Sequence, residues 1–243
     1  MAIKKGIYAA SMSVFKDDLS LDLNSTIQHA ENLIEEGCHG VAIFGSTGQS
    51  QLISTKEKKK LIEQLSHSNF KEHFLIGTGT NSLNENIEIM QHCLKNNFNR
   101  FLIMPPAYYK YGDEGNYAFF SNMIQKIPES EIILYNFEKL SGYKFSSQIV
   151  KKLVKDFPKQ ILGIKDSTYN LYETLRIPNF LVFPGSETKL LKGLELGCSG
   201  IISAVCNVTA PLARKVYDDF GSKKKQTFNN KLCAVRSTFD NFN

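Results

Sequence analysis

Short apolar runs recur along the chain and alternate with amphipathic segments. The runs are rich in Ile, Val, Leu and Phe and contain few polar positions, which is typical of strands covered on both faces. They span residues 6–13, 40–44, 74–78, 100–104, 131–136, 161–166, 180–184 and 200–205. The pattern therefore predicts eight buried strands.

The segments between the runs have the spacing of amphipathic helices. Ile27, Ala30 and Leu33 fall on one helical face, and a later segment opens with Ser54 or Thr55 as its N-cap residue. Helices of this kind are predicted over residues 23–37, 54–65, 82–97, 146–157 and 188–197. Strand and helix thus alternate along the sequence.

Eight apolar strands that alternate with helices predict a closed parallel (β/α)8 barrel, the TIM barrel. A doubly wound open sheet is the competing interpretation, but the glycine-rich phosphate loop that follows the first strand of such folds is missing from this sequence. No linker rich in Gly, Ser or Pro divides the chain. We therefore expect one domain over residues 1–243, with the barrel over about 6–220 and a shortened C-terminal helical extension over about 221–243.

Composition narrows the function classes. With 42% hydrophobic and 22% charged residues and a net charge of +5, the chain has the composition of an ordinary globular protein. Its densest basic runs, Lys56–Lys60 and Lys223–Lys225, are typical of solvated helix faces, so no nucleic-acid partner is expected. The five cysteines lack zinc-ligand spacing, and no segment resembles a signal peptide or a membrane span. We expect a cytoplasmic protein without a metal or membrane partner.

The sixth run ends in Gly-Ile-Lys-Asp-Ser and places Lys165 where a buried strand should end. In a TIM barrel the active site lies at the carboxyl ends of the strands. A lysine at that position is partly desolvated and presents an amine that can form a Schiff base with a ketone. The alternative is a lysine that reaches solvent or pairs with Asp166.

Two other strand ends carry candidate chemistry. The fifth run ends near Tyr135, whose phenol can relay protons beside an imine-forming lysine, although a lone tyrosine more commonly packs at the top of a barrel. The second run leads into Gly45–Ser50, where Gly45 permits a tight turn and Ser46 and Thr47 offer hydroxyls near a helix N-terminus. Such a turn can hold a carboxylate, and the same residue types also form plain turns.

The last two strands supply further candidates. Gly185 and Glu187 follow the seventh run, and Glu187 either binds substrate hydroxyls or begins the next helix. Backbone carbonyl groups around Ile202, in the eighth run, are expected to face the barrel mouth.

Taken together, these segments resemble one enzyme family. The stretch AENLIEEGCHGVAIFGSTGQS and the motifs PPAYY, ILYNFEKLSG, GIKDS, PGSE and LGCSGIISAVCN are similar in order and spacing to those of the dihydrodipicolinate synthase / N-acetylneuraminate lyase family, the pyruvate-dependent class I aldolases. The similarity covers residues 6 to about 220. It implies a TIM barrel that forms a covalent imine with pyruvate or another 2-keto acid and uses no metal or other cofactor.

The resemblance also implies roles for single residues. Lys165 matches the Schiff-base lysine, Tyr135 matches the proton-shuttling tyrosine, and Ser46 and Thr47 match the pair that binds the keto-acid carboxylate. Tyr109 matches a catalytic-site tyrosine that members of the synthase branch insert into the neighbouring subunit, so a homo-oligomer (a dimer or tetramer) is expected.

One position separates branches of the family. The resemblance aligns Leu140 with an arginine of the synthases that holds the semialdehyde carboxylate. The neighbouring Lys139 is not geometrically equivalent to that arginine. The loop sequences are closer to those of 2-keto-3-deoxy sugar acid aldolases, which makes Ser167 a candidate partner for substrate hydroxyls. Ile202 matches the residue of the wider family whose backbone carbonyl faces the lysine.

We therefore predict a lyase that reversibly cleaves a 2-keto-3-deoxy sugar acid to pyruvate and an aldehyde. Two alternatives remain: a dihydrodipicolinate synthase that condenses pyruvate with aspartate semialdehyde, and a non-catalytic barrel that binds a keto acid.

Overall fold

The computed structural model describes residues 3–242 and contains a ring of eight parallel strands. The strands are β1 (Gly6–Ala10), β2 (Gly40–Ile43), β3 (Phe74–Gly77), β4 (Arg100–Ile103), β5 (Glu131–Asn136), β6 (Ile161–Asp166), β7 (Leu181–Pro184) and β8 (Gly200–Ser203). Their order is β7-β6-β5-β4-β3-β2-β1-β8. Ser199 bridges β7 and β8, because its backbone N–H donates to the carbonyl of Val182 at 2.8 Å. The predicted TIM barrel is confirmed.

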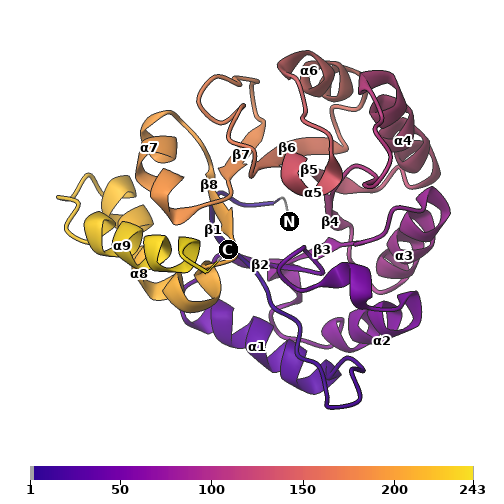
Figure 1. The fold of residues 1–243 in the computed structure, drawn as a ribbon, viewed down its shortest axis with the longest axis horizontal. Helices are drawn as coiled ribbons and strands as arrows, with labels where there is room; N and C mark the ends of the chain where they lie inside the picture. Colours follow the sequence, from indigo (N-terminus) through magenta and orange to yellow (C-terminus); the bar gives the residue numbers. More distant parts are fainter. Residues whose placement is uncertain (1–2, 243) are drawn as a thin grey trace.

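Helices surround the strands on the outside of the barrel (Figure 1). They are α1 (Leu23–Glu35), α2 (Thr55–Leu65), α3 (Leu83–Lys95), α4 (Asp113–Lys126), α5 (Glu138–Ser141), α6 (Ser147–Asp156), α7 (Leu190–Glu195), α8 (Cys206–Gly221) and α9 (Asn229–Asp240). Ser54 caps α2 in a capping box with Glu57, as one of the two predicted N-cap residues. The five predicted helices therefore form where the sequence pattern placed them.

Alternation along the strands divides the buried apolar side chains into two layers. Ile7 and Ala9 belong to the large outer layer between strands and helices, whereas Tyr8 and Ala10 belong to a smaller cluster inside the ring. The inner cluster consists of Tyr8, Ala10, Ala42, Leu75, Leu102, Ile133, Tyr135, Phe183 and Ile202. The barrel is therefore filled by side chains, and its upper inner positions belong to the site.

The sixth crossover departs from the expected alternation. Residues 167–180, between β6 and β7, form turns and contain no helix among the described residues. The crossover includes Pro178, which removes a backbone donor, and the carboxylate of Asp166 accepts hydrogen bonds from the N–H groups of Tyr169, Leu171 and Tyr172. Backbone donors that a helix would satisfy internally are thus satisfied by a side chain instead.

Helix α4 was not among the predicted helices. Its polar and apolar residues do not separate cleanly, because Asn116 is fully buried beside the buried Phe119 and Phe120. The amide nitrogen of Asn116 donates to the carbonyls of Tyr111 and Gly112, while its Oδ1 is buried without a hydrogen-bond partner among the described residues. The polar Asn116 at a core position interrupts the apolar spacing of an amphipathic helix, so the sequence pattern did not predict α4.

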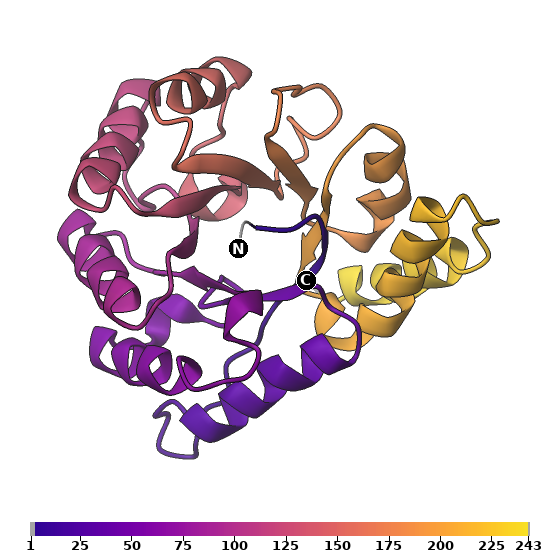
Figure 2. The same cartoon turned by 180° about the vertical axis from the view of Figure 1, so that it is seen from behind.

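The segment before β1 and helix α9 lie on opposite faces of the barrel (Figure 1 and Figure 2). Figure 1 views the barrel along its axis with α5, which follows the carboxyl end of β5, in front of the strands, and α9 crosses α8 toward the mouth. From behind, the N-terminal segment leads into β1 at the opposite face (Figure 2). The expected C-terminal helical segment is therefore present as α9 and lies on the side of the strand carboxyl ends.

Candidate active site

Strands β5 and β6 bring Tyr135 and Lys165 together. The two residues are register partners in the parallel ladder, so their side chains leave the sheet on the same face. Ile164, one residue earlier, lies in the outer apolar layer, and alternation turns Lys165 inward. The Lys165 ammonium nitrogen Nζ lies 4.1 Å from the centre of the Tyr135 ring. Both side chains are buried, at 3% and 4% exposure.

Lys165 Nζ makes no hydrogen bond or ion pair to a residue in the range 3–242; its contact is the face of the Tyr135 ring. A buried ammonium normally has a charged or hydrogen-bonding partner, because desolvation of an isolated charge is costly. The structure instead leaves this amine facing a cavity. That arrangement suits an amine that reacts with a carbonyl compound.

The β2–α2 connection supplies the hydroxyl groups. Ser46 Oγ and Tyr135 Oη lie 2.9 Å apart and share a hydrogen bond. The turn that presents Ser46 is tight, with Phe44 and Gln49 at positive φ. Gly48 is the position that requires glycine, since a Cβ there would lie 2.8 Å from the carbonyl oxygen of Ser11.

These side chains line a cavity of about 600 Å³ at the barrel mouth. Its lining consists of Ser46, Thr47, Tyr135, Phe137, Glu138, Lys139, Lys165, Ser167, Thr168, Tyr169, Gly185, Ala204 and Arg236. Six of the ten residues predicted for the site are in this set: Ser46, Thr47, Tyr135, Lys165, Ser167 and Gly185. A Cβ on Gly185 would lie 2.3 Å from Ser167 Oγ, so glycine allows this wall to pack closely.

The other four predicted residues lie elsewhere. Gly45 lines a neighbouring cavity of about 360 Å³, which shares Ser46 and Tyr135 with the first and is also lined by Leu140. Ile202 is fully buried in the inner apolar cluster of the barrel. The neighbouring cavity is more apolar, so the mouth has two chemically different halves.

Glu187 lies behind the cavity wall and is fully buried. Its carboxylate accepts hydrogen bonds from Ser203 Oγ at 2.7 Å, Thr209 Oγ1 at 3.2 Å and Cys206 Sγ at 3.3 Å. Burial and this carboxylate raise the pKa of the Cys206 thiol well above its usual range. Arg236 Nε approaches Glu187 Oε2 at 3.5 Å. Glu187 also stands in the turn that begins the next helical segment, which was the alternative expectation for it.

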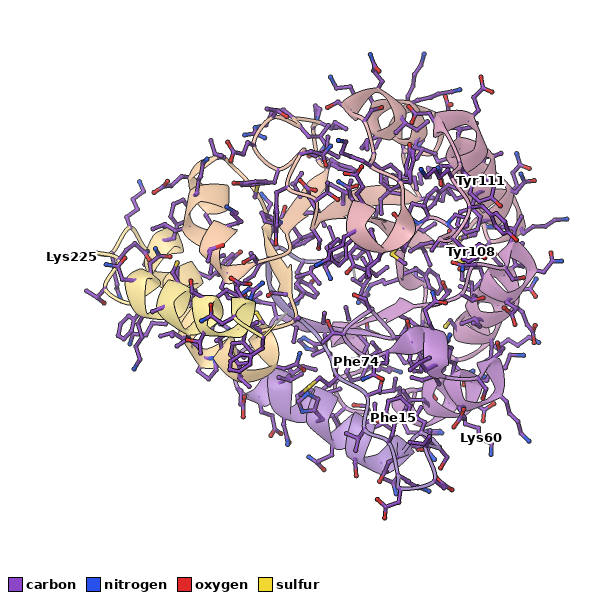
Figure 3. The ribbon with its side chains drawn as sticks, in the orientation of Figure 1. Phe15, Lys60, Phe74, Tyr108, Tyr111 and Lys225 are labelled. Atoms are coloured by element: carbon purple, nitrogen blue, oxygen red, sulfur yellow. The ribbon has the colours of Figure 1, made fainter. Side chains whose placement is uncertain are left out.

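Tyr109 lies on the surface, in the connection between β4 and α4. It is 65% exposed and packs edge-on against Tyr108 and Tyr111, with ring centres 4.9 Å and 6.4 Å away. Figure 3 shows Tyr108 and Tyr111 on the opposite side of the molecule from Lys225. The structure thus places Tyr109 in an exposed aromatic cluster and outside the linings of both cavities at the mouth.

Two functional candidates escaped the sequence interpretation. Arg236 reaches the cavity from α9, about 70 residues after Lys165, and no local motif marks it. Asp166 was considered only as a partner for Lys165, whereas it binds the crossover that carries Ser167 and Tyr169. Burial raises the pKa of Tyr169, so its phenol stays protonated at neutral pH.

Within residues 3–242 no group of three or more His, Cys, Asp and Glu side chains is arranged to hold a metal ion. No helix of the described chain has the length and apolar character needed to cross a bilayer.

Comparison with known proteins identifies the family. The family model of the dihydrodipicolinate synthetase family matches residues 4–238. A 4-hydroxy-tetrahydrodipicolinate synthase of Methanothrix thermoacetophila is 32% identical over 218 residues, covering 86% of this chain and 71% of the relative. This chain belongs to the dihydrodipicolinate synthetase family. The family predicted from the motifs is confirmed, and the protein is a lyase of the class I aldolase type.

Solved structures share the fold of this chain. YagE of E. coli K12, a member of the dihydrodipicolinic acid synthase family solved in complex with pyruvate, is 25% identical and aligns over 98% of this chain and 84% of YagE, with a TM-score of 0.88. A 2-keto 3-deoxygluconate aldolase from Picrophilus torridus shares the fold at 22% identity, covering 97% of this chain and 84% of that one, with a TM-score of 0.82. Relatives of different specificity thus share this barrel.

Proposed function

We propose that Lys165 forms an imine with the carbonyl carbon of a 2-keto acid and that the protein reversibly cleaves a 2-keto-3-deoxy sugar acid to pyruvate and an aldehyde. The observation that carries this proposal is the contact between the buried Lys165 amine and Tyr135, whose hydroxyl bonds to Ser46 at the edge of one cavity. The pyruvate complex of YagE supports a pyruvate-binding site in this family.

The reaction uses the chain's own side chains at each step. The amine of Lys165 attacks the ketone, and loss of water from the carbinolamine gives the imine. Tyr135 and Ser46, joined at 2.9 Å, carry protons to and from that oxygen and later from the aldehyde-side hydroxyl. The imine accepts the electron pair of the broken C3–C4 bond, and reprotonation and hydrolysis then release pyruvate.

The proposed substrate contacts divide between two groups of residues. Ser46 and Thr47 hold the keto-acid carboxylate with hydroxyl and backbone donors, while the carbonyl of Ile202 faces the lysine. Ser167 and Gly185 form the wall for the hydroxylated fragment. Leu140 favours a sugar-acid substrate over aspartate semialdehyde, because an aliphatic side chain gives a carboxylate no partner at that position.

Dihydrodipicolinate synthesis is the second candidate. The name of the Methanothrix relative favours it, and so does Arg236, which places a guanidinium on the cavity wall despite Leu140. A panel of 2-keto-3-deoxy acids assayed for pyruvate release, beside condensation of pyruvate with aspartate semialdehyde, separates the two. Turnover of the semialdehyde that matches or exceeds turnover of every sugar acid would replace the first proposal with the second.

Oligomerisation belongs to the same proposal. Exposed Tyr109, in its cluster of three tyrosines, has the character of a side chain that a second copy of the chain would cover. In the proposed homo-oligomer this tyrosine completes the site of the neighbouring subunit.

Imine formation is tested by reduction with borohydride in the presence of pyruvate. The wild-type protein should gain a permanent adduct on the peptide that contains Lys165, and Lys165→Ala should gain none. Lys139→Ala is the matched control, since Lys139 also lines the cavity. Absence of an adduct on wild-type protein at saturating pyruvate would refute the proposal.

A further inference from the structure

The turn after β6 places a tyrosine on the cavity wall in an uncommon backbone conformation. Tyr169 lines the same cavity as Lys165 and has a φ of 63°. We propose that the ring of Tyr169 is a wall against which the carbon chain of the aldehyde fragment packs, so that Tyr169 determines the length of aldehyde that the site prefers. This inference rests on the proposed imine chemistry and specifies its substrate class further, as aldehydes of three or four carbons in preference to two.

The backbone conformation of Tyr169 is unfavourable for a tyrosine. At positive φ the Cβ atom of an L-residue crowds the neighbouring carbonyl oxygen, and glycine, asparagine and aspartate adopt this region far more readily. Among the described residues that line this cavity, Tyr169 is the one at positive φ. Outliers of this kind persist where surrounding contacts hold them, and they cluster at ligand sites.

The turn itself does not require an aromatic side chain. Asp166 Oδ1 accepts from the Tyr169 N–H at 2.9 Å. Asp166 Oδ2 accepts from the N–H groups of Leu171 and Tyr172 at 2.8 Å each. These bonds use backbone donors, so glycine at position 169 would close the same turn at a lower conformational cost. The ring of Tyr169 therefore has to be explained by its contacts beyond the turn.

The protein covers the ring only in part. The buried Tyr172 packs against it edge-on, with ring centres 6.3 Å apart and an interplanar angle of 84°. The ammonium of Lys189 lies 5.7 Å from the ring centre. Tyr169 nevertheless remains 36% exposed while it lines the cavity. Its neighbours thus hold the ring in place and leave apolar surface for a ligand to cover.

The cavity has room for a carbon chain beside this ring. Its volume of about 600 Å³ far exceeds the needs of pyruvate, which Lys165 and Tyr135 would hold at one end. The crossover that carries Tyr169 also supplies Ser167 and Thr168 to the lining. A polyhydroxy aldehyde presents C–H groups, which pack on an aromatic ring, and hydroxyl groups, which serine and threonine can bind. One short segment thus offers both kinds of contact.

A purely structural role is the competing explanation for Tyr169. In that case the ring only covers Tyr172, and its removal would lower the stability of the fold and the rates with all aldehydes together. A packing surface for the substrate instead affects an aldehyde in proportion to the carbon atoms that reach it. The two explanations therefore differ in a ratio of rates.

The experiment measures kcat/KM for condensation of pyruvate with glycolaldehyde, glyceraldehyde and erythrose, which have two, three and four carbons. The wild-type protein should prefer the better of the two longer aldehydes over glycolaldehyde by about tenfold or more, the scale of one added carbon in a fitted pocket. Tyr169→Gly should reduce that ratio to about threefold or less, chiefly through slower reaction of the longer aldehydes. Tyr169→Phe keeps the ring and should keep the ratio.

Leu19→Gly is the matched control. Leu19 also has a positive φ, of 65°, but it is 81% exposed and lies outside the linings of both cavities at the mouth. This variant removes a large side chain from the same backbone conformation and should keep the wild-type ratio.

Tyr169→Asn provides a second way to remove the ring, because asparagine tolerates positive φ. It should lose the length preference as Tyr169→Gly does. Thermal scans establish that each variant is folded at the temperature of the assay, so the result does not depend on a single substitution.

Three results would overturn the inference. They are a wild-type protein without preference for a longer aldehyde, an unchanged ratio in Tyr169→Gly and Tyr169→Asn, and a ratio in Tyr169→Phe as low as that in Tyr169→Gly. Borohydride trapping with pyruvate is measured on the same wild-type protein. Trapping without a length preference refutes only the role of Tyr169, whereas absence of trapping refutes the imine proposal itself.

Discussion

Asp166 is predicted to hold the wall of the site, and Asp166→Asn tests that role. The carboxylate is fully buried. Oδ1 accepts from Asn136 Nδ2 at 2.8 Å and from the Tyr169 N–H at 2.9 Å, and Oδ2 accepts from the Leu171 and Tyr172 N–H groups at 2.8 Å each. The three bonds from backbone N–H groups replace internal bonds of the helix that the sixth crossover lacks, and the bond from Asn136 ties the carboxylate to β5.

The expected loss follows from counting donors. Asparagine has the shape of aspartate but one acceptor oxygen, and its NH2 group must face one of the two donor pairs. Two donors then lose their partner, at about 1–3 kcal/mol each, or about 2–6 kcal/mol in total. With about 2.1 cal/mol/K of unfolding entropy per residue, a chain of 243 residues loses about 2 °C of Tm per kcal/mol, so Tm should fall by about 4–12 °C.

The assay is urea unfolding monitored by circular dichroism, with a thermal scan beside it. Asp156→Asn is the matched control, since Asp156 is exposed and accepts one hydrogen bond, from the Tyr117 hydroxyl at 2.8 Å. It should change the free energy of unfolding by about 0.5 kcal/mol or less. Equal stabilities of the two variants would show that the buried carboxylate does not organise the crossover.

Three other changes test separate parts of the structure. Tyr135→Phe removes the hydroxyl that bonds to Ser46 and should lower kcat by about 10²–10⁴-fold, measured as pyruvate release, while the folded spectrum persists. Burial lowers the pKa of Lys58 from 10.5 to about 8, so the folded protein binds fewer protons than the unfolded chain between these values and gains stability as pH rises through them. Relative to Lys58→Met, wild type should gain on the order of 3 kcal/mol from pH 8 to 10.5 in urea unfolding, and a constant difference would contradict this. Tyr109→Ala should reduce the oligomeric mass in analytical ultracentrifugation and slow turnover; unchanged mass and rate would remove this tyrosine from the site.

The strand scaffold was predictable because its signals are local. Each strand is a short apolar run, and the period of two decides which residues face the barrel interior. That period alone turns Lys165 inward, since Ile164 before it packs outward. The β2 turn was recognisable from its glycine, serine and threonine residues, and Ser46 indeed meets Tyr135. Residues at strand ends therefore converge whenever the barrel itself is predicted correctly.

The remaining features depend on contacts between distant segments. Arg236 sits on an amphipathic helix whose sequence does not say which part of the barrel it covers. Glu187 was expected either to bind substrate or to begin a helix, and its burial follows from donors on β8 and α8. The sequence did not show that the sixth crossover lacks a helix, because the crossover is stabilised by hydrogen bonds to Asp166 and not by a local sequence pattern. Tertiary contacts of this kind have no period to detect.

Two buried carboxylates therefore contact segments of the cavity wall that are separate from the strands carrying Lys165 and Tyr135. Asp166 fixes the crossover that carries Ser167 and Tyr169, and Glu187 forms an ion pair with the arginine of α9. Lys165 and Tyr135 are positioned by the strands themselves. A change in the segment beyond Asp166 or in α9 is expected to alter that part of the cavity wall more than the positions of Lys165 and Tyr135. This separation directs the search for the substrate of this chain to the segments around Asp166 and Glu187.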